Sequence, residues 1–306
     1  MPDNINWLED RVRGVGAALV IDGGMGTLLQ HSGVPMHGKV WSGQAVLSHP
    51  EAVLRAHEAF IEAGAEAIIT NTFAAARHML EPGSLGQQVK EINLNAVQLA
   101  RQARDNVAKE PVAIVGSICE WAPTDNPKWH TAKAVNNSVR EQAELLAEAG
   151  VDLIALEMCQ EIELSIAATE AVLETGLPFW IGMSAQTHQG CDNLSVFDYA
   201  ELDFESLVKA LAGYPAMMMN IMHTPITDID RALSTLRQYW DGPIGIYPES
   251  GYFTMPDWHF VDIVEPEELA EMAQSWIDKG VRMVGGCCGL GPEHIAALRQ
   301  TLNPRN

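Results

Sequence analysis

Two adjacent cysteines near the end of the chain are the residues whose types most directly suggest chemistry. Cys287 and Cys288 lie in the stretch "VRMVGGCCGLGPEHI". A disulfide between sequence neighbours is strained, so we do not expect a structural crosslink. Thiolates bind zinc at about 2.3 Å in a tetrahedral arrangement, and the flanking glycines would let the chain direct both sulfurs at one centre. Two small residues packed in a turn would fit the same pattern, and spacing alone leaves both interpretations open.

The elements that must position this pair follow from the hydrophobic pattern. Residues 50–64, which begin with proline and end with glycine, are typical of the helices expected between apolar segments. The apolar segments are continuous, as in strands buried on both faces of a parallel sheet. We expect eight such strands, at residues 17–22, 65–71, 112–118, 151–157, 179–185, 216–222, 243–249 and 281–287. Eight alternations of strand and helix predict an α/β fold, a (β/α)8 TIM barrel formed by residues 1–306 as a single domain.

Polar or sulfur-containing residues stand at the end of every expected strand. In a barrel of this kind, function is located at the C-terminal ends of the strands. A single polar residue in such a place is often a cap, so the indication comes from all of them together. These residues are Asp22, Asn71, Thr72, Ser117, Glu157, Ser184, Asn220, Glu249, Cys287 and Cys288.

Composition excludes several classes of partner. The chain has 47% hydrophobic residues, enough for a large core. Its formal net charge is −21, and a surface with this negative charge repels nucleic acid and anionic membranes. The N-terminus lacks the apolar core of a signal peptide, and no stretch approaches the roughly 20 apolar residues that span a bilayer. The five cysteines suggest no disulfide framework. We therefore expect a cytoplasmic protein with small-molecule partners, and the sequence leaves its oligomeric state open, a homo-oligomer included.

Several motifs resemble one known family. "GGCCG" followed by "GPEHI" is similar to the C-terminal signature of the homocysteine S-methyltransferase family. "DGGMGT" at 22–27, the segment 41–73 with its "NTF", and "AGVDLIALEM" at 149–158 resemble three further motifs of that family. The resemblance covers nearly the whole chain. It implies a barrel with zinc at its mouth that transfers a methyl group to the thiol of homocysteine or a similar acceptor.

The resemblance also implies roles for individual residues. Cys287 and Cys288 would hold the zinc and thereby serve catalysis, because the metal deprotonates a thiol whose pKa is otherwise about 8.5. The carboxylates of Asp22 and Glu157 would pair with the ammonium group of the acceptor, although turn capping is the alternative for both. The complete set of expected substrate-binding residues is Asp22, Gly23, Asn71, Thr72, Glu157 and Asn220.

One expected zinc ligand is missing. The family supplies a third cysteine directly after the asparagine of the sixth strand, where this chain reads "MMMNIMHTP" and has Ile221 after Asn220. Three explanations stand side by side: His223 is a substitute ligand, the metal is lost or weakly held, or Ile221 is an engineered replacement. If Cys287 and Cys288 are two corners of a site, Ile221→Cys is expected to raise zinc occupancy. A diverged member that only binds a small molecule, or acts on a different substrate, is the alternative function.

The methyl donor is expected to be a small cation. Aromatic faces attract sulfonium and quaternary ammonium groups, but large rings also stabilise long loops. A chain of this length resembles the stand-alone type that uses S-methylmethionine, with a betaine-like donor second. A barrel lyase acting on a phosphorylated substrate ranks last, because the glycines of 285–291 have no nearby cation except Arg282. The aromatic residues expected in the mouth loops are Trp41, Phe73, Trp121, Trp129, Tyr252, Phe253 and Trp258.

Overall fold

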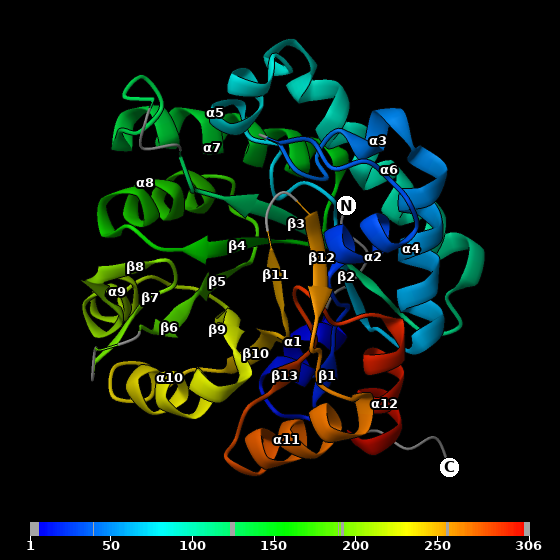
Figure 1. Ribbon diagram of the computed structural model, residues 1–306, viewed down its shortest axis with the longest axis vertical. Helices are drawn as coiled ribbons and strands as arrows, with labels where there is room; N and C mark the ends of the chain where they lie inside the picture. The colour runs from blue at the N-terminus through cyan, green and yellow to red at the C-terminus, as the bar shows by residue number, and fades with distance from the viewer. Residues whose placement is uncertain are drawn as a thin grey trace.

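The barrel is a ring of parallel strands in sequence order. The computed structural model describes residues 6–38, 40–122, 126–188, 190, 193–254 and 257–302. Each barrel strand pairs with the next, the last pairs with the first, and a bridge between Ile21 and Ala67 joins the first to the second (Figure 1). The predicted TIM barrel is confirmed. Its strands are β1 (Leu19–Val20), β2 (Ala67–Ile69), β3 (Ala113–Cys119), β4 (Leu153–Cys159), β5 (Phe179–Met183), β9 (Met218–Pro225), β10 (Ile244–Glu249) and β13 (Met283–Val284).

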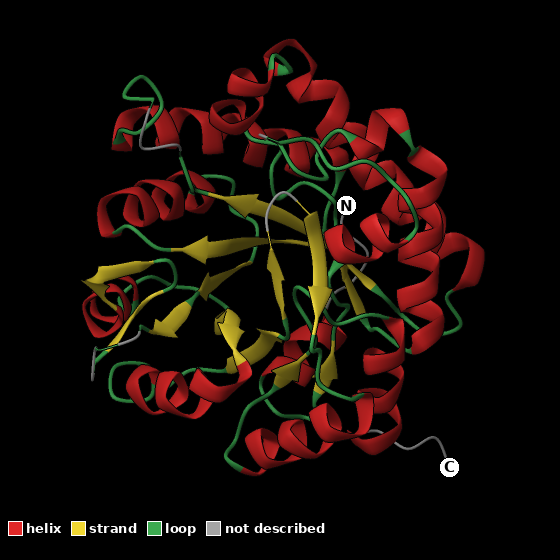
Figure 2. Ribbon diagram, in the orientation of Figure 1, coloured by secondary structure: helices red, strands yellow, loops and turns green. Residues whose placement is uncertain are grey.

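Helices surround the strands on all sides in Figure 2. Their ends follow the expected signals. Helix α4 has proline at its start and Gly64 in the left-handed conformation at its end (φ 110°), while the Thr131 side chain caps α7 by accepting a hydrogen bond from the Ala134 N–H. The longer helices are α4 (Pro50–Ala63), α6 (Val89–Val107), α7 (Ala132–Ala149), α8 (Ile162–Leu173), α9 (Phe204–Leu211), α10 (Ile229–Leu236), α11 (Pro266–Asp278) and α12 (Pro292–Leu302). The shorter ones are α1 (Asn6–Val12), α2 (Met25–His31), α3 (Ala45–Ser48) and α5 (Arg77–Leu80).

Side chains alternate between two core layers, as the period of a strand requires. One layer fills the barrel and includes Leu19, Ile21, Val115, Leu153, Ala155, Trp180, Met218, Met222, Tyr247 and Met283. The other lies between the strands and the helices and includes Val20, Ile68, Ile114, Ile154, Ile181, Met219, Ile221, Ile246 and Val284. This double burial explains the continuous apolar segments of the sequence.

Two antiparallel additions extend the mouth of the barrel, and neither was expected from the sequence. A three-stranded sheet follows β5 and consists of β6 (Ala185–Thr187), β7 (Leu194–Val196) and β8 (Tyr199–Asp203). A hairpin of β11 (Tyr252–Thr254) and β12 (Asp257–Val261) follows β10, and β12 contacts α2. Both insertions leave from C-terminal ends of barrel strands, so they lie at the functional end.

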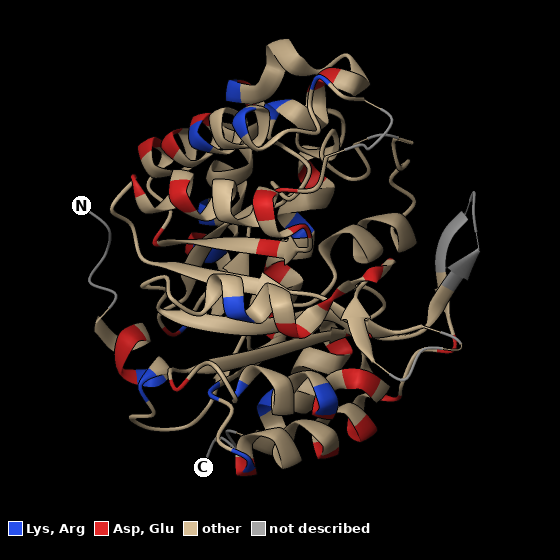
Figure 3. Cartoon of the chain, turned by 90° about the vertical axis from the view of Figure 1, so that its left-hand side faces the viewer, with Lys and Arg blue, Asp and Glu red and all other residues tan. Residues whose placement is uncertain are grey.

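The opposite end of the barrel is held by an ion-pair network. The Glu66 carboxylate, which precedes β2, lies 2.7 Å from Nη1 of Arg11 and 2.9 Å from Nη1 of Arg299. It also accepts a hydrogen bond from the N–H of Val20. These contacts tie α1 and α12 to the first two strands. Elsewhere acidic residues outnumber basic ones over the outer surface (Figure 3), and no described helix has both the length and the apolar character needed to cross a membrane.

Candidate metal and substrate site

The cysteine pair lies on a turn that is fixed from two sides. The N–H of Cys287 donates to Pro248 O (2.8 Å), and the Ser250 N–H donates to Cys288 O (3.0 Å), so the turn is bound to the end of β10. Gly289 follows in the left-handed region (φ 84°), and a Cβ atom there would lie 2.1 Å from Ser250 O. Glycine is therefore required at this position, as the sequence indicated.

The turn after β1 locks onto the same segment. Asp22 O accepts a hydrogen bond from the Gly286 N–H, and the Gly24 N–H donates to Leu290 O. A Cβ atom on Gly23 would lie 2.3 Å from Leu290 O. The structure thus gives Gly23 a packing role, which brings the Asp22 backbone next to the cysteine turn. A backbone contact from Gly23 to substrate stays a prediction.

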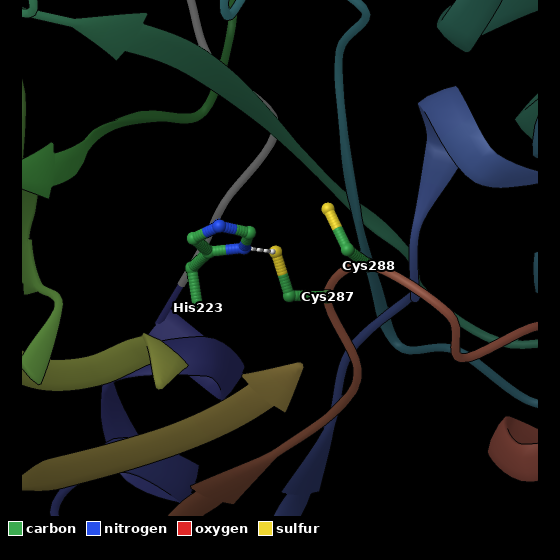
Figure 4. Close-up of side chains that lie close together, drawn as sticks. All are labelled: His223, Cys287 and Cys288. Atoms are coloured by element: carbon green, nitrogen blue, oxygen red, sulfur yellow. Dashed lines mark hydrogen bonds between the residues drawn. The ribbon is translucent and has the colours of Figure 1, made fainter. Parts of the chain in front are cut away.

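Cys287, Cys288 and His223 form one cluster (Figure 4). One ligand atom of each residue lies within 4.8 Å of the others. The Nδ1 atom of His223 is 3.4 Å from Sγ of Cys287. The structure therefore brings together the two thiols and the histidine that the sequence singled out.

A bulge in β9 delivers the imidazole. Strict alternation would place His223 outside the barrel, because Met222 belongs to the inner layer. Met222 pairs with Tyr247, but Pro225 pairs with Glu249, so β9 contains one more residue than β10 in this interval. His223 also has a positive φ of 44°. The extra residue and the unusual backbone angle turn the side chain toward the cysteines, which is a common use of bulges near functional sites.

The imidazole is enclosed on its remaining sides. Its Nε2 lies 3.3 Å from Oε2 of Glu249, and the Phe197 ring packs edge-on with a centroid distance of 4.6 Å. Burial lowers the pKa of His223, but Cys287 and Glu249 outweigh burial and raise it to about 9. Burial raises the pKa of Glu249, and His223 opposes that rise.

These three residues fit a zinc ion. Two sulfurs and one imidazole nitrogen are a ligand set that zinc uses when a fourth position stays open for substrate. The hydrogen bond with Cys288, together with burial, raises the pKa of Cys287 well above its ordinary value. Without a cation this thiol is protonated at neutral pH. A bound metal ion would stabilise the thiolate and so favour deprotonation.

Glu157 and Asp22 form the second part of the mouth. The Ser117 hydroxyl donates to Oε2 of Glu157, while Oδ2 of Asp22 accepts from the Ile69 N–H at 2.7 Å. Burial raises the pKa of Glu157 to about 7, although Ser117 and Tyr247 lower it. Burial also raises the pKa of Asp22 well above its ordinary value, and the charge of Glu157 adds to this.

Tyr247 connects the two parts. It belongs to the inner layer against which Cys287 and Met158 pack. Its pKa is raised by burial, by the Glu157 carboxylate and by the Cys287 sulfur. Asp22 and Glu157 are 1% and 6% exposed, and no lysine or arginine pairs with either among the residues that the structure describes. Two buried carboxylates without a basic partner are suited to a cationic ligand.

Two of the expected binding residues use their side chains for internal contacts. The Asn71 amide accepts from the Ser42 hydroxyl and donates to Ser42 O, both at 2.9 Å. The Thr72 hydroxyl donates to Ser117 O at 2.7 Å. These bonds hold the loops around Glu157. Any contact with substrate stays a prediction and falls to the backbone of Asn71 and Thr72.

Asn220 lies deeper, inside the barrel. It is fully buried, and a Cβ atom on Gly245 would lie only 2.4 Å from its Oδ1. Neither end of its amide has a hydrogen-bond partner within the described part of the chain. Substrate contact by Asn220 stays a prediction.

No individual role was predicted from the sequence for Ser117, Phe197, Tyr247 or Glu249. Ser117 and Glu249 were visible as polar residues at strand ends. Tyr247 could have been found by alternation, since it lies two residues beyond Gly245 on the inner face of β10. Phe197 comes from the β7–β8 turn, which no pattern predicted.

Some of the expected aromatic residues line one side of the mouth. Phe73, Trp121 and Met158, the residue after Glu157, all pack against a small buried cluster. The Trp41 ring meets Phe73 edge-on at 6.3 Å. Trp129 instead lies under the Lys128 ammonium group, at 4.4 Å. The others are Tyr252, which is 60% exposed, and Phe253 and Trp258, whose side chains lie outside the described part of the structure.

Comparisons with known proteins relate the whole chain to one family. Residues 19–302 match the family model described as Homocysteine S-methyltransferase. The chain is 27% identical to Homocysteine S-methyltransferase 3 of Zea mays, over 95% of this chain and 92% of that protein. It is 26% identical to an S-methylmethionine–homocysteine S-methyltransferase of Pongo abelii, over 94% of this chain and 79% of that protein. The metallated form of the homocysteine methyltransferase MmuM from Escherichia coli has the same fold, with a TM-score of 0.76, 24% identity, and coverage of 97% of this chain and 99% of that one.

Proposed function

Because the chain belongs to the homocysteine S-methyltransferase family and is thus an S-methyltransferase, we propose that it moves a methyl group from a small onium donor to the thiol of homocysteine or a similar acceptor. One observation carries the proposal. Cys287, Cys288 and His223 form one cluster at the C-terminal ends of β13 and β9. Asp22 and Glu157 lie at the C-terminal ends of β1 and β4 of the same parallel barrel, so all five residues are at one mouth. A metal bound at the cluster would take the thiol of an amino acid, and the two carboxylates would take its ammonium group.

The protein's main contribution is to position the acceptor. Asp22 and Glu157 pair with its ammonium group, and the Ser117 hydroxyl holds the Glu157 carboxylate in place. Cys287, Cys288 and His223 would hold the zinc ion, with Asn220 below them and the backbone of Gly23, Asn71 and Thr72 around the acceptor. Zinc, when bound, lowers the pKa of the acceptor thiol so that its sulfur is a thiolate at neutral pH.

The transfer itself is a displacement at carbon. The acceptor sulfur, having released its proton to water, forms a bond to the methyl carbon with its lone pair. The bond from that carbon to the positively charged heteroatom of the donor breaks, and the heteroatom keeps the electron pair and becomes neutral. Alignment of the two substrates accounts for much of the rate in such reactions.

The donor binds on the aromatic side of the mouth. Phe73 and Trp121 pack against the same small cluster as Met158, the residue that follows Glu157 in the chain. Ring faces and nearby carboxylates both attract a cation, and the attraction ends when the donor loses its charge. S-methylmethionine is the leading donor and a betaine-like molecule the second.

The chain is proposed to work in the cytoplasm as a single catalytic domain. Cys119, Cys159, Cys287 and Cys288 are free thiols in the structure, which suits a reducing compartment. Its partners are the two small substrates, and assembly into a homo-oligomer stays a prediction.

The direct test is formation of methionine from homocysteine and S-methylmethionine by purified protein supplied with zinc. We expect turnover that depends on both substrates and falls when Asp22 or Glu157 is replaced by its amide. Betaine in place of S-methylmethionine tests the second donor. Binding of homocysteine without any methionine would instead favour a diverged member that binds its ligand without transfer.

A further inference from the structure

We infer that Glu249 is a positioning residue for the zinc ligand His223, and that this carboxylate–histidine pair replaces the third thiolate of the family's metal site. The inference rests on the proposed metal centre and deepens it. Glu249 does not touch the metal or the acceptor in this scheme. It acts through the imidazole, by fixing which nitrogen carries the proton.

The two ring nitrogens of His223 face two different partners. Nδ1 lies 3.4 Å from Sγ of Cys287, and Nε2 lies 3.3 Å from Oε2 of Glu249. An ionised carboxylate only accepts hydrogen bonds, so it favours the tautomer with hydrogen on Nε2. The lone pair of Nδ1 then points toward the two sulfurs (Figure 4). This arrangement, with a carboxylate behind a ligating imidazole, is the usual outer contact of zinc-bound histidine.

The backbone around His223 is built to hold this orientation. Its positive φ of 44° is unusual for a residue with a side chain and strains the backbone. The next residue secures the bulge, because the Thr224 hydroxyl donates to Met222 O and accepts from the Ala185 N–H. Phe197 closes the exposed face of the ring. A histidine that only filled space would need neither the bulge nor the strain.

The burial and the charge of Glu249 also support this role. Glu249 is 9% exposed, and among the described residues no lysine or arginine pairs with it. A buried carboxylate without a basic partner is costly unless a cationic group lies nearby. Two thiolates and one carboxylate also carry the same formal charge as three thiolates. Glu249 therefore compensates for the negative charge that is lost when a neutral imidazole takes the place of a thiolate.

The test is the Zn²⁺ affinity of the full chain carrying Glu249→Gln, measured by competition with a chromophoric chelator. We expect affinity to fall about 10–100-fold, less than in His223→Ala, with partial recovery in Glu249→Asp. The matched control is Glu161→Gln. Its carboxylate lies 3.2 Å from Nε2 of His130, outside the cluster, and its removal should leave Zn²⁺ affinity unchanged.

A second pair of variants separates positioning from a general structural effect. In a His223→Cys background the third ligand has no N–H for the Glu249 carboxylate to accept a hydrogen bond from. Adding Glu249→Gln to it should therefore change Zn²⁺ affinity by less than about twofold. An equal loss in both backgrounds would overturn the inference, as would wild-type affinity in Glu249→Gln alone. If the wild-type chain itself binds no Zn²⁺, the metal centre and this inference fail together, whereas the methionine assay still decides the proposed methyl transfer.

Discussion

Asn220 and Ile221 are neighbours on β9 but lie on opposite sides of the barrel wall. Asn220 packs over Gly245 inside the barrel, whereas Ile221 belongs to the layer between the strands and the helices. A side chain at position 221 therefore faces away from Cys287. The third member of the metal cluster is instead His223, which lies two residues further along, in the bulge of β9.

This relationship changes the outcome expected for Ile221→Cys. From the sequence, a thiol at 221 should raise zinc occupancy. With the side chain directed at the helices, we now expect no increase, and a loss of about 1–3 kcal/mol of folding free energy from the missing core volume. Elemental analysis gives the occupancy, and urea denaturation gives the stability. A clear gain of zinc would show that β9 can rotate this position into the mouth.

Removal of any one ligand tests the cluster directly. Cys287→Ala, Cys288→Ala and His223→Ala should each reduce Zn²⁺ affinity by more than the roughly 10–100-fold typical of outer contacts, and methyl transfer should fall with it. The control is Cys159→Ala, since that thiol is buried outside the cluster. Unchanged zinc content in Cys288→Ala would remove Cys288 from the ligand set and leave Cys287 and His223 as the remaining ligands.

The barrel could be predicted from the sequence because each strand is buried on both faces and each helix carries its own start and stop signals. The two cysteines were also predictable, since glycine on both sides marks a tight turn. The orientation of His223 was not. It depends on one extra residue in β9 relative to β10, and register between strands is a property of the sheet rather than of either segment.

Contacts between loops that are distant in the sequence could not be predicted either. The Ser117 hydroxyl meets Glu157 because β3 and β4 are neighbours, but serine at a strand end has many uses. Asn71 and Thr72 were expected to bind substrate through backbone and side-chain hydrogen bonds, and in the structure their side chains bond to Ser42 and Ser117. Residue type indicates what a group can do, and only the fold shows which partner it has.

Catalysis should respond to pH through Glu157. Burial raises its pKa from 4.5 to about 7, and pairing with the acceptor's ammonium group requires the ionised form. We expect kcat/KM for the acceptor to rise about tenfold per unit at pH values below 7 and to level off above it. Glu157→Gln should flatten this limb and lower the plateau by roughly 10–100-fold, the loss of a charge-assisted hydrogen bond. Zinc content measured at each pH separates this effect from loss of metal.

The same pKa has a consequence for stability with the opposite sign. A folded-state pKa above the unfolded value means that the folded protein holds the proton more tightly. This contribution is fully present below pH 4.5 and is lost as the pH rises through about 7. Wild-type stability should therefore decline more steeply than that of Glu157→Gln between these values. Parallel pH profiles of the two proteins in urea denaturation would contradict the assignment.

The ion-pair network at the other end of the barrel should matter for stability alone. Glu66→Gln leaves Arg11 and Arg299 without their carboxylate in a partly buried place, and we expect a loss of about 3 kcal/mol. Because the network lies at the opposite end from the cysteines, kcat of the folded variant should not change. Glu9→Gln breaks an exposed pair with Arg13 and should cost less than about 1 kcal/mol. A fall in kcat at full folding would link the two ends.

The aromatic side of the mouth should determine affinity for the donor. If Phe73 and Trp121 attract an onium group, Trp121→Leu should raise KM for S-methylmethionine by about 2–30-fold, the value of a cation–aromatic contact of roughly 0.5–2 kcal/mol. Trp121→Phe retains a ring face and should recover most of the loss. KM for homocysteine should stay constant, because that substrate is held by Asp22 and Glu157. Equal effects of Trp121→Leu on both substrates would mean that the ring supports the loop after β3 rather than the donor, since Trp121 packs against the cluster of Ala74, Met79 and Cys119 in either case.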